Sequence, residues 1–423
     1  MHIDPIVGRR LLFAAAAAGL AVRLAFGLLY WVDKPLTHDE REYLALAQGI
    51  TAGRGFAYEA GDESGTTQQF GRAPAYPLFL AAIGAGRAPH DSAPAGVKVA
   101  QSFVGALCVW VIGLLAWRLG GVTAGVVSAW IAAVYPPLIW IDAYVLTEGL
   151  YCGLALSTVL VLDRAIDRAD AKQPWTPWAI AAGILCGIAI LVRPAMLFFL
   201  PVAGVWLFRR HRLALAAVAI MTSLVVVAPW TVRNYRTYGR FVLVASEGGV
   251  TFWTGNHPLA RGEGDLAANP DIKVAEIAFR ARHPDLTAEQ LEPLYYREAV
   301  EYIAHHPVWW VGLLGRKLFY TFVPIGPSYT LHSTLYAASS IVSYLLLVPF
   351  AIAGVRAHRR RGQPALRAPK GPEALFLLAA SAVLVCILFF PQERFRIPVI
   401  DPVLIIAAAA AAGLPRETGG DFA

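Results

Sequence analysis

The chain of 423 residues contains little charge. Asp, Glu, Lys and Arg together make up 15% of it, while hydrophobic residues make up 57% and the mean hydropathy is +0.53. Water-soluble domains average about 25% charged residues. Long apolar stretches recur from one end of the chain to the other. This composition excludes a soluble globular protein and predicts an all-α polytopic membrane protein.

The chain also contains few cysteines. The four cysteines all lie inside apolar runs, and they form no CxxC pair and no Cys/His cluster with zinc spacing. No two histidines are four residues apart, as the two ligands on a zinc-binding helix are. The cysteines are therefore interpreted as small core or lipid-facing residues. The sequence predicts no disulfide framework, no metal site and no dedicated cofactor.

The formal net charge of +7 does not indicate nucleic-acid binding. The cations fall in short loops beside apolar segments, a pattern that sets the orientation of a membrane protein. Arg9 and Arg10 precede a run of alanines and so imitate a signal peptide. The apolar segment continues for about 20 residues, which is longer than a typical cleaved h-region. We therefore expect a retained first helix.

About ten apolar spans are predicted, which places both termini on the same side of the membrane. The basic loops between these spans then all fall on the cytoplasmic side. In this orientation the two large loops face outward. The predicted spans cover residues 11–31, 97–117, 120–140, 143–163, 176–192, 194–208, 212–230, 334–355, 373–390 and 397–413.

Three parts follow from this topology. Residues 1–230 form an N-terminal transmembrane module with the first outer loop at 32–96. Residues 231–333 form an extracytoplasmic segment, and residues 334–423 supply the C-terminal transmembrane helices. Residues 73–86 are apolar but too short to span, and they are interpreted as an interfacial or re-entrant helix. Residues 307–323 carry Arg316 and Lys317 in their middle and are interpreted as an interfacial helix.

Both outer segments carry helix-start signals. In "THDEREY" at 37–43, Thr37 and Glu40 have the Thr-x-x-Glu spacing of a capping box. In the second outer segment, Thr287 and Gln290 repeat this pattern before an apolar stripe of Leu291, Leu294, Tyr295 and Ala299. We therefore expect helices at 37–48 and 287–307. The glycine pairs in "GGVTFWTGN" at 248–256 are interpreted as turns.

An ordered set of motifs runs along most of the chain: "HDEREY", "GRAPAYPLFLAA", "VYPPLIW" with "VLTEGL", "LVRPA", "APWTVRNY" with "GGVTFWTGN", and "ERFRIPV". This set resembles the bacterial branch of the polyprenyl-phosphate-sugar glycosyltransferases. These membrane enzymes have the C-type glycosyltransferase fold and are similar to protein O-mannosyltransferases and lipid A aminoarabinose transferases. The resemblance implies transfer of a sugar from a polyprenyl phosphate to an acceptor on the outer face.

Glycosyl transfer to a hydroxyl needs a carboxylate for the acceptor proton and cations for the departing phosphate. The resemblance places the catalytic acid in the first outer loop, where the matching residue is Asp39. We expect Asp39 to be the general base and Glu40 to orient the acceptor or the helix that carries Asp39. The alternative is that both acids only stabilise a helix N-terminus.

Several further residues are predicted to bind substrate. Arg72 lies where the family places a cation near the donor phosphate, although it could instead snorkel to lipid headgroups. Arg394 and Arg396 stand on the outer side against the positive-inside trend, and a salt bridge with Glu393 is the alternative for them. The complete set of predicted substrate-binding residues is Arg72, Tyr76, Glu148, Arg193, Arg233, Arg394 and Arg396.

Glu148 is predicted to lie about one and a half turns inside the fourth span, where an ionisable group is a functional candidate. A frayed start of the span would make it an ordinary interfacial acid. Asp142 is expected to be more exposed and less informative. A divalent metal held by Asp39 and Glu148 is a less favoured alternative to a metal-free site.

A lipid or lipid-linked-sugar transporter, or flippase, is the rival class. Transporters commonly have repeated halves and charges near the bilayer midplane. This sequence has no internal repeat, and its informative charges gather at one outer face. A purely structural protein would leave those charges without a role. Inversion at the anomeric carbon follows from the resemblance. The sequence does not specify which sugar moves, or whether a lipid, a polysaccharide or a protein accepts it.

Overall fold

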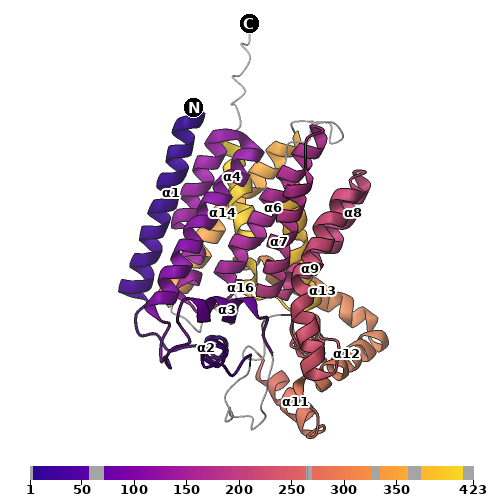
Figure 1. Cartoon of the computed structure of the whole chain (residues 1–423). Helices are drawn as coiled ribbons and strands as arrows, with labels where there is room; N and C mark the ends of the chain where they lie inside the picture. Colours follow the sequence, from indigo (N-terminus) through magenta and orange to yellow (C-terminus); the bar gives the residue numbers. More distant parts are fainter. Residues whose placement is uncertain are drawn as a thin grey trace.

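The computed structural model describes residues 3–56, 71–262, 264, 269–324, 334–360 and 373–412. In these ranges the regular structure is helical, apart from one isolated antiparallel bridge between Pro35 and Ser92. Long helices form a bundle, and shorter helices gather at one end of it (Figure 1). The chain begins at the other end, so α1 crosses the full height of the bundle before the short helices follow.

The bundle is built from helices that are rich in apolar residues. α1 continues into a π-helical turn at Phe26–Tyr30, and α8 is preceded by a 3-10 turn at Pro194–Phe198. The bundle helices are α1 (Pro5–Ala25), α4 (Ala95–Val134), α5 (Pro136–Trp140), α6 (Glu148–Asp170), α7 (Thr176–Val192), α8 (Phe199–Arg209), α9 (Leu213–Tyr238), α14 (Thr334–Arg360), α15 (Glu373–Leu388) and α17 (Ile400–Ala412).

These helices account for the predicted spans. Five of them are long and apolar enough to cross a membrane, and four shorter apolar helices accompany them. α4 covers two predicted spans because it folds back at Gly121, whose φ of +80° ends the first half. A Cβ on Gly125 would lie 2.9 Å from the carbonyl oxygen of Gly113, so the two halves pack together without an intervening side chain. The prediction of a polytopic all-α membrane protein is confirmed.

Some element boundaries differ from the prediction. α6 begins at Glu148 and not at residue 143, because a 3-10 turn at Ile141–Ala143 and an extended Tyr144 precede it. α9 continues to Tyr238 and ends at Gly239, a left-handed glycine, so Arg233 lies on a helix and not in the outer loop. Residues 248–256 form α10, and the prediction of turns there was wrong. The predicted span 397–413 ends outside the described residues.

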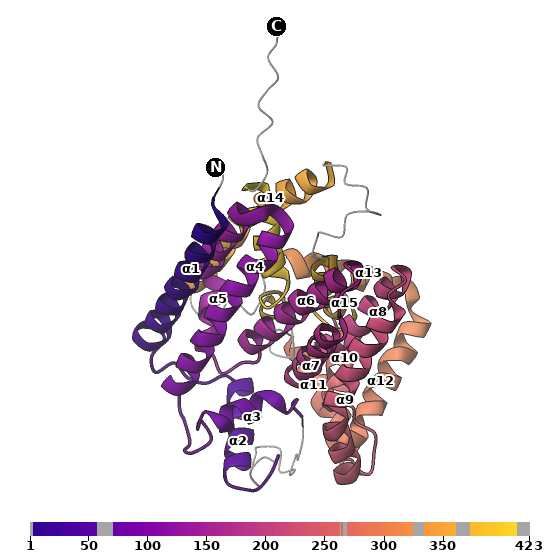
Figure 2. The ribbon, with the colours of Figure 1, turned by 45° about the horizontal axis from the view of Figure 1, so that its top comes forward.

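The short helices at the outer end follow local signals. α2 (His38–Thr51) has the predicted capping box, and α12 (Ala288–His305) has the second one. The outer set also contains α3 (Ala75–Ala82), α10 (Gly248–Asn256), α11 (Pro270–Ala281), α13 (Pro307–Phe322) and α16 (Glu393–Arg396). The second view separates α2 and α3 from the layer of α9, α11 and α12 (Figure 2).

α12 uses its predicted apolar stripe to build a small core. Leu291, Tyr295 and Ala299 are buried against Trp253 and Phe279, and Leu294 packs against the same cluster. Trp253 belongs to α10 and Phe279 to α11, so this core joins three helices of the second outer segment. Since burial of large aromatic side chains is strongly stabilising, we infer that the segment is a folded layer. The division of the chain into three parts stays a prediction.

The Asn256 side chain joins this layer to the bundle. Its amide donates to the carbonyl oxygens of Phe252 and Leu388, at 2.8 and 2.9 Å. Its oxygen accepts from Trp310 and from the buried ammonium of Lys317, at 3.0 Å each. Because Leu388 is the last residue of α15, this knot of hydrogen bonds fixes the point from which the chain continues to α16.

Candidate active site

Charged residues from five segments form a connected series of ion pairs at the outer end of the bundle. Asp39 lies at its centre and accepts from Arg72 at 2.7 Å and from Arg394 at 2.5 Å. Arg394 also lies 3.9 Å from the carboxylate of Glu148, which pairs with Arg193 at 2.7 Å. Five residues predicted separately from the sequence are thus brought together in one cluster, which we call the Asp39 cluster.

The start of α2 sets the position of Asp39. One Glu40 oxygen accepts from the backbone N–H and the hydroxyl of Thr37, at 2.8 and 2.9 Å. The other Glu40 oxygen accepts from the backbone N–H of Val145, at 2.8 Å. Glu40 is 3% exposed, so its carboxylate is committed to these contacts. This geometry supports the predicted role of orienting the helix that carries Asp39, and gives no free oxygen for an acceptor.

Arg72 packs on the ring of Tyr43, which is itself supported by Tyr76. Its guanidinium lies 5.1 Å from the centre of the Tyr43 ring, and Tyr43 packs edge-to-face on Tyr76. The Tyr76 hydroxyl donates to Gln101 at 2.7 Å, and the side chain is fully buried. Tyr76 therefore supports the cluster through Tyr43 and is not placed to contact a substrate in this structure.

The other side of the cluster depends on the turn between α15 and α17. Arg394 donates to Gln392 at 2.8 Å, which orients its guanidinium toward Asp39. Arg193 lies 4.5 Å from the centre of the Phe395 ring and donates to the hydroxyl of Thr147 at 3.2 Å. Glu148 is the first residue of α6 and is 2% exposed. Glu148 therefore does not lie deep inside a span. It differs from an ordinary interfacial acid because it is buried and has Arg193 and Arg394 close to its carboxylate.

The electrostatics of Asp39 follow from this packing. Burial alone would raise the pKa of Asp39, but the charges of Arg394 and Arg72 outweigh burial and hold the pKa well below its ordinary value. The carboxylate is therefore ionised at neutral pH. It is also a weak base as long as both arginines stay in place, because basicity falls with the pKa.

Two predicted residues lie outside the cluster. Arg396 is 2% exposed, pairs with Asp401 at 2.7 Å and lies 3.8 Å from the centre of the Tyr344 ring. Arg233 donates to Tyr238 at 3.0 Å and lies against the Trp230 ring. Arg396 thus links α16 to α17 and α14, whereas these contacts of Arg233 lie within α9. Arg394 pairs with Asp39, and Arg396 pairs with Asp401.

The sequence interpretation missed several acids. Glu42 and Glu247 both pair with Arg72, and Asp142 forms a buried ion pair with Arg23 of α1 at 2.8 Å. Asp142 is 3% exposed, so the expectation of an exposed residue was wrong. The signal that could have found it is Arg23 itself, a cation inside an apolar span that needs a buried counter-ion.

A metal between Asp39 and Glu148 does not fit this arrangement. The guanidinium of Arg394 lies between the two carboxylates, in contact with Asp39 and 3.9 Å from Glu148. In the described part of the chain, no group of three or more His, Cys, Asp and Glu side chains is placed to hold a metal ion. The Arg394 guanidinium therefore occupies the place where a metal ion would have to bind both carboxylates.

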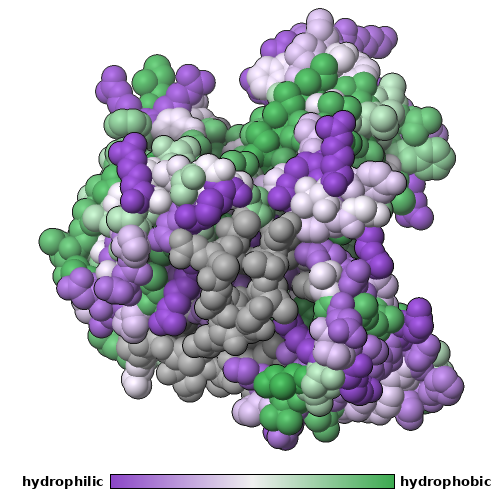
Figure 3. Space-filling view, turned by 60° about the horizontal axis from the view of Figure 1, so that its bottom comes forward, coloured by the Kyte–Doolittle hydropathy of each residue, from purple (hydrophilic) through white to green (hydrophobic). Residues whose placement is uncertain are grey.

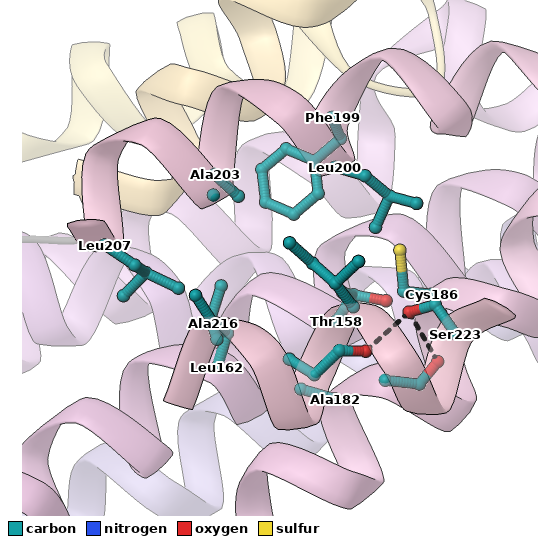
Figure 4. Close-up of a pocket in the computed structure, with 14 residues that line it drawn as sticks. Thr158, Leu162, Ala182, Cys186, Phe199, Leu200, Ala203, Leu207, Ala216 and Ser223 are labelled. Carbon is teal, nitrogen blue, oxygen red and sulfur yellow. Dashed lines mark hydrogen bonds between the residues drawn. The ribbon is translucent and has the colours of Figure 1, made fainter. Parts of the chain in front are cut away.

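The outer face that carries α2 and α3 displays hydrophilic side chains interspersed with apolar ones (Figure 3). A separate small pocket lies among α6, α7, α8 and α9 and has apolar walls (Figure 4). The hydroxyl groups in its lining donate to backbone carbonyl oxygens: Thr158 donates to Leu154, and Ser223 donates to Gly183 and Ala219. Thr158 lies about 15 Å along α6 from Glu148, at the 1.5 Å rise of a helix. The lining contains no Asp, Glu, His, Lys or Arg side chain, and the pocket is separate from the Asp39 cluster.

Comparisons with known proteins address the family and the fold of this chain. The model of the family described as dolichyl-phosphate-mannose-protein mannosyltransferase matches residues 82–242. No curated protein matches the chain. The matched stretch contains Glu148, Arg193 and Arg233, but it excludes Asp39, Arg72 and Arg394.

Among solved structures, the archaeal oligosaccharyltransferase AglB from Archaeoglobus fulgidus, in complex with an inhibitory peptide and a dolichol-phosphate, aligns with a TM-score of 0.58 at 17% identity. The alignment covers 96% of this chain and 50% of AglB. A structure of the Archaeoglobus fulgidus oligosaccharyltransferase tethered with an acceptor peptide aligns with a TM-score of 0.59 at 17% identity, covering 96% of this chain and 49% of that one. This chain therefore spans about half the length of AglB.

ArnT from Cupriavidus metallidurans, bound to undecaprenyl phosphate, aligns at 13% identity over 97% of this chain and 76% of that one. Its TM-score of 0.45 is too low to establish a common fold. The predicted resemblance is confirmed by the family match and by the AglB alignments. The chain has the C-type glycosyltransferase fold, and it resembles the dolichyl-phosphate-mannose-protein mannosyltransferases over residues 82–242.

Proposed function

We propose that this protein is an integral-membrane glycosyltransferase that moves a sugar from a polyprenyl-phosphate donor to an acceptor. The observation that carries the proposal is the position of Asp39 between Arg72 and Arg394, with Glu148 and Arg193 beside them. Arginines that are already oriented and partly buried are suited to a phosphate, since a guanidinium can give two hydrogen bonds to phosphate oxygens.

In the proposed reaction these residues act on the acceptor and on the departing phosphate, and inversion is what the family resemblance implies. An acceptor hydroxyl attacks the anomeric carbon, and the bond between that carbon and the phosphate oxygen breaks with inversion. The electron pair stays on the departing polyprenyl phosphate, whose charge Arg72 and Arg394 stabilise. When these arginines bind the phosphate, Asp39 loses part of their charge and its pKa rises. Asp39 then becomes a competent base for the hydroxyl proton.

The transferred group is proposed to be a hexose or a pentose, and the acceptor a lipid, a polysaccharide or a protein. No dedicated cofactor is assigned. We place the enzyme in a bacterial inner membrane with the Asp39 cluster on the extracytoplasmic side and both termini in the cytoplasm. The cluster and the start of α1 lie at opposite ends of the bundle, which is compatible with this orientation (Figure 1). No contact in the described residues favours a transporter or flippase over a transferase.

The test measures sugar transfer from a panel of radiolabelled polyprenyl-phosphate sugars in membranes that contain the wild-type protein, Asp39→Asn or Arg72→Ala. A matched control is Asp91→Asn, which removes an exposed acid from the same outer loop. We expect transfer by wild type and by the control. A general base contributes about 10²–10⁴-fold, so Asp39→Asn should lose activity by that factor at equal folded protein.

Two results would count against the proposal. Transfer by Asp39→Asn at the wild-type rate would remove Asp39 from the chemistry. Movement of the intact lipid across vesicles by wild type, without transfer from any donor in the panel, would favour the transporter.

A further inference from the structure

Arg72 is shared by acids from both outer segments. Its guanidinium contacts Asp39 and Glu42 of α2, and its Nε lies 3.2 Å from the carboxylate of Glu247. Glu247 is the residue before the first turn of α10. Residues that are about 200 positions apart in the chain thus meet on one guanidinium, whose five N–H donors allow such sharing.

Glu247 is the most weakly held of these acids. Asp39 has a second arginine, Arg394, and Glu42 has His38 at 3.4 Å. Among the described residues, Glu247 forms an ion pair with Arg72 alone. Its side chain is also 36% exposed, against 20% for Asp39 and 22% for Glu42. A rise in local negative charge would therefore displace Glu247 from Arg72 before it displaced the other two.

We propose that Glu247 is a positioning residue that holds Arg72 before the donor binds and then competes with the donor phosphate for this arginine. The inference rests on the proposed function, because it takes the phosphate of a polyprenyl-phosphate donor as the competing anion. It also gives the second outer segment a direct contact with the donor site, through the start of α10.

The charge of Glu247 sets the competition. Burial raises the pKa of Glu247 to about 7; the charge of Arg72 opposes this rise, and the charges of Glu42 and Asp39 add to it. Below this pH the carboxyl is neutral and releases Arg72 to the phosphate. Above it the carboxylate is ionised and retains Arg72. Phosphate binding should therefore weaken as the pH rises from about 6 to about 8.

His38 titrates in the same neighbourhood and has to be separated from Glu247. Its hydrogen bond with Glu42 raises the pKa of His38 above the ordinary value. Loss of the His38 charge at higher pH would also weaken anion binding. Since His38 contacts Glu42 and not Glu247, a substitution at each position distinguishes the two contributions.

The experiment measures binding of farnesyl methyl phosphate to the purified full-length protein by calorimetry at pH 6, 7 and 8. This phosphodiester keeps one negative charge throughout, so changes in affinity report on the protein. The variants are Glu247→Gln, which keeps the side-chain shape, and His38→Gln. The matched control is Glu298→Gln, which changes a half-exposed acid of α12 that pairs with Arg282.

Wild type and Glu298→Gln should bind more weakly at pH 8 than at pH 6. Glu247→Gln should bind about two- to fivefold more tightly than wild type at pH 8, as expected for a partly exposed ion pair, and should lose most of the pH dependence. Equal affinities of wild type and Glu247→Gln at pH 8 would overturn the inference, as would a pH dependence that disappears only in His38→Gln.

Transfer assays on the same preparations distinguish the two proposals. Binding with the expected Glu247 effect but without transfer from any donor would contradict the proposed function and leave the inference standing. Transfer without a Glu247 effect on binding would support the proposed function and contradict the inference.

Discussion

At the scale of single residues, the decisive feature is that Asp39 is neutralised by arginines that a phosphate can also bind. Arg72 precedes α3 and Arg394 belongs to α16, so the acid and its cations lie on separate segments. Separate elements can adjust independently when a ligand enters. Under the proposed function, this arrangement keeps Asp39 a weak base until a donor phosphate is bound.

Arg394 should not tolerate replacement by lysine. A lysine ammonium is a point charge and cannot contact Asp39 and Gln392 while lying close to Glu148, as the guanidinium does. We expect Arg394→Lys to lower kcat/KM for the donor by about 10-fold or more, and Arg394→Gln by a larger factor. Initial-rate kinetics measure both. Arg41→Gln, which removes an exposed cation from α2, is the control and should stay near wild type.

Chelation should leave transfer unchanged. Arg394 stands between Asp39 and Glu148, so the two acids are not free to share a divalent ion. We expect the same initial rate before and after treatment with EDTA, and no increase when Mg²⁺, Mn²⁺ or Ca²⁺ is added back. A loss of activity that one of these ions restores would show that the acids rearrange around a metal when substrate binds.

At the scale of elements, buried ion pairs fix helices that the sequence alone leaves independent. Arg23 of α1 donates to Asp142 at 2.8 Å and to the carbonyl oxygen of Gly19 at 3.2 Å. Gly105 and Gly149 pack so close to this pair that a Cβ on either would clash with the Asp142 carboxylate. The pair therefore sets how α1, α4 and the start of α6 approach one another.

Breaking this pair on one side should destabilise the bundle. Arg23→Met leaves the Asp142 carboxylate buried without its counter-ion, which costs about 3–5 kcal/mol in comparable cases. Thermal unfolding in detergent should show a clear fall in Tm. The double variant Arg23→Met/Asp142→Asn should recover part of the loss, because no unpaired charge remains. Arg9→Met, at an exposed position near the start of α1, should change the Tm little.

At the scale of the whole molecule, the charged cluster lies at one end of the bundle, near the short outer helices (Figure 1). α10, α11 and α12 share their own core, and the Asn256 knot attaches this layer to α15 just before Arg394. The two outer segments meet at Arg72 through Glu247.

The proposed orientation can be tested because all four native cysteines are buried. A cysteine at Arg87, in the first outer loop, should react with a membrane-impermeant maleimide in intact cells. A cysteine at Arg209, the last residue of α8, should react only after the membrane is opened. Both positions are exposed. Labelling of Arg209→Cys in intact cells, with Arg87→Cys protected, would reverse the orientation.

The sequence alone determined the membrane class, the approximate spans, both capping boxes and the candidates Asp39, Arg72, Glu148, Arg193 and Arg394. These features depend on local signals: apolar length, the spacing of capping residues, and charge placed where lipid makes it costly. In the structure, ion pairs join these five residues in one cluster.

The pairing of those charges was decided by tertiary structure. Arg394 and Arg396 are two positions apart, yet one contacts Asp39 and the other Asp401, since a two-residue step on a helix points to nearly opposite sides. Asp142 and Glu247 gained their roles from Arg23 and Arg72, which are distant in the chain. An ion pair depends on which surfaces meet when helices pack, and local sequence patterns carry no information about that meeting.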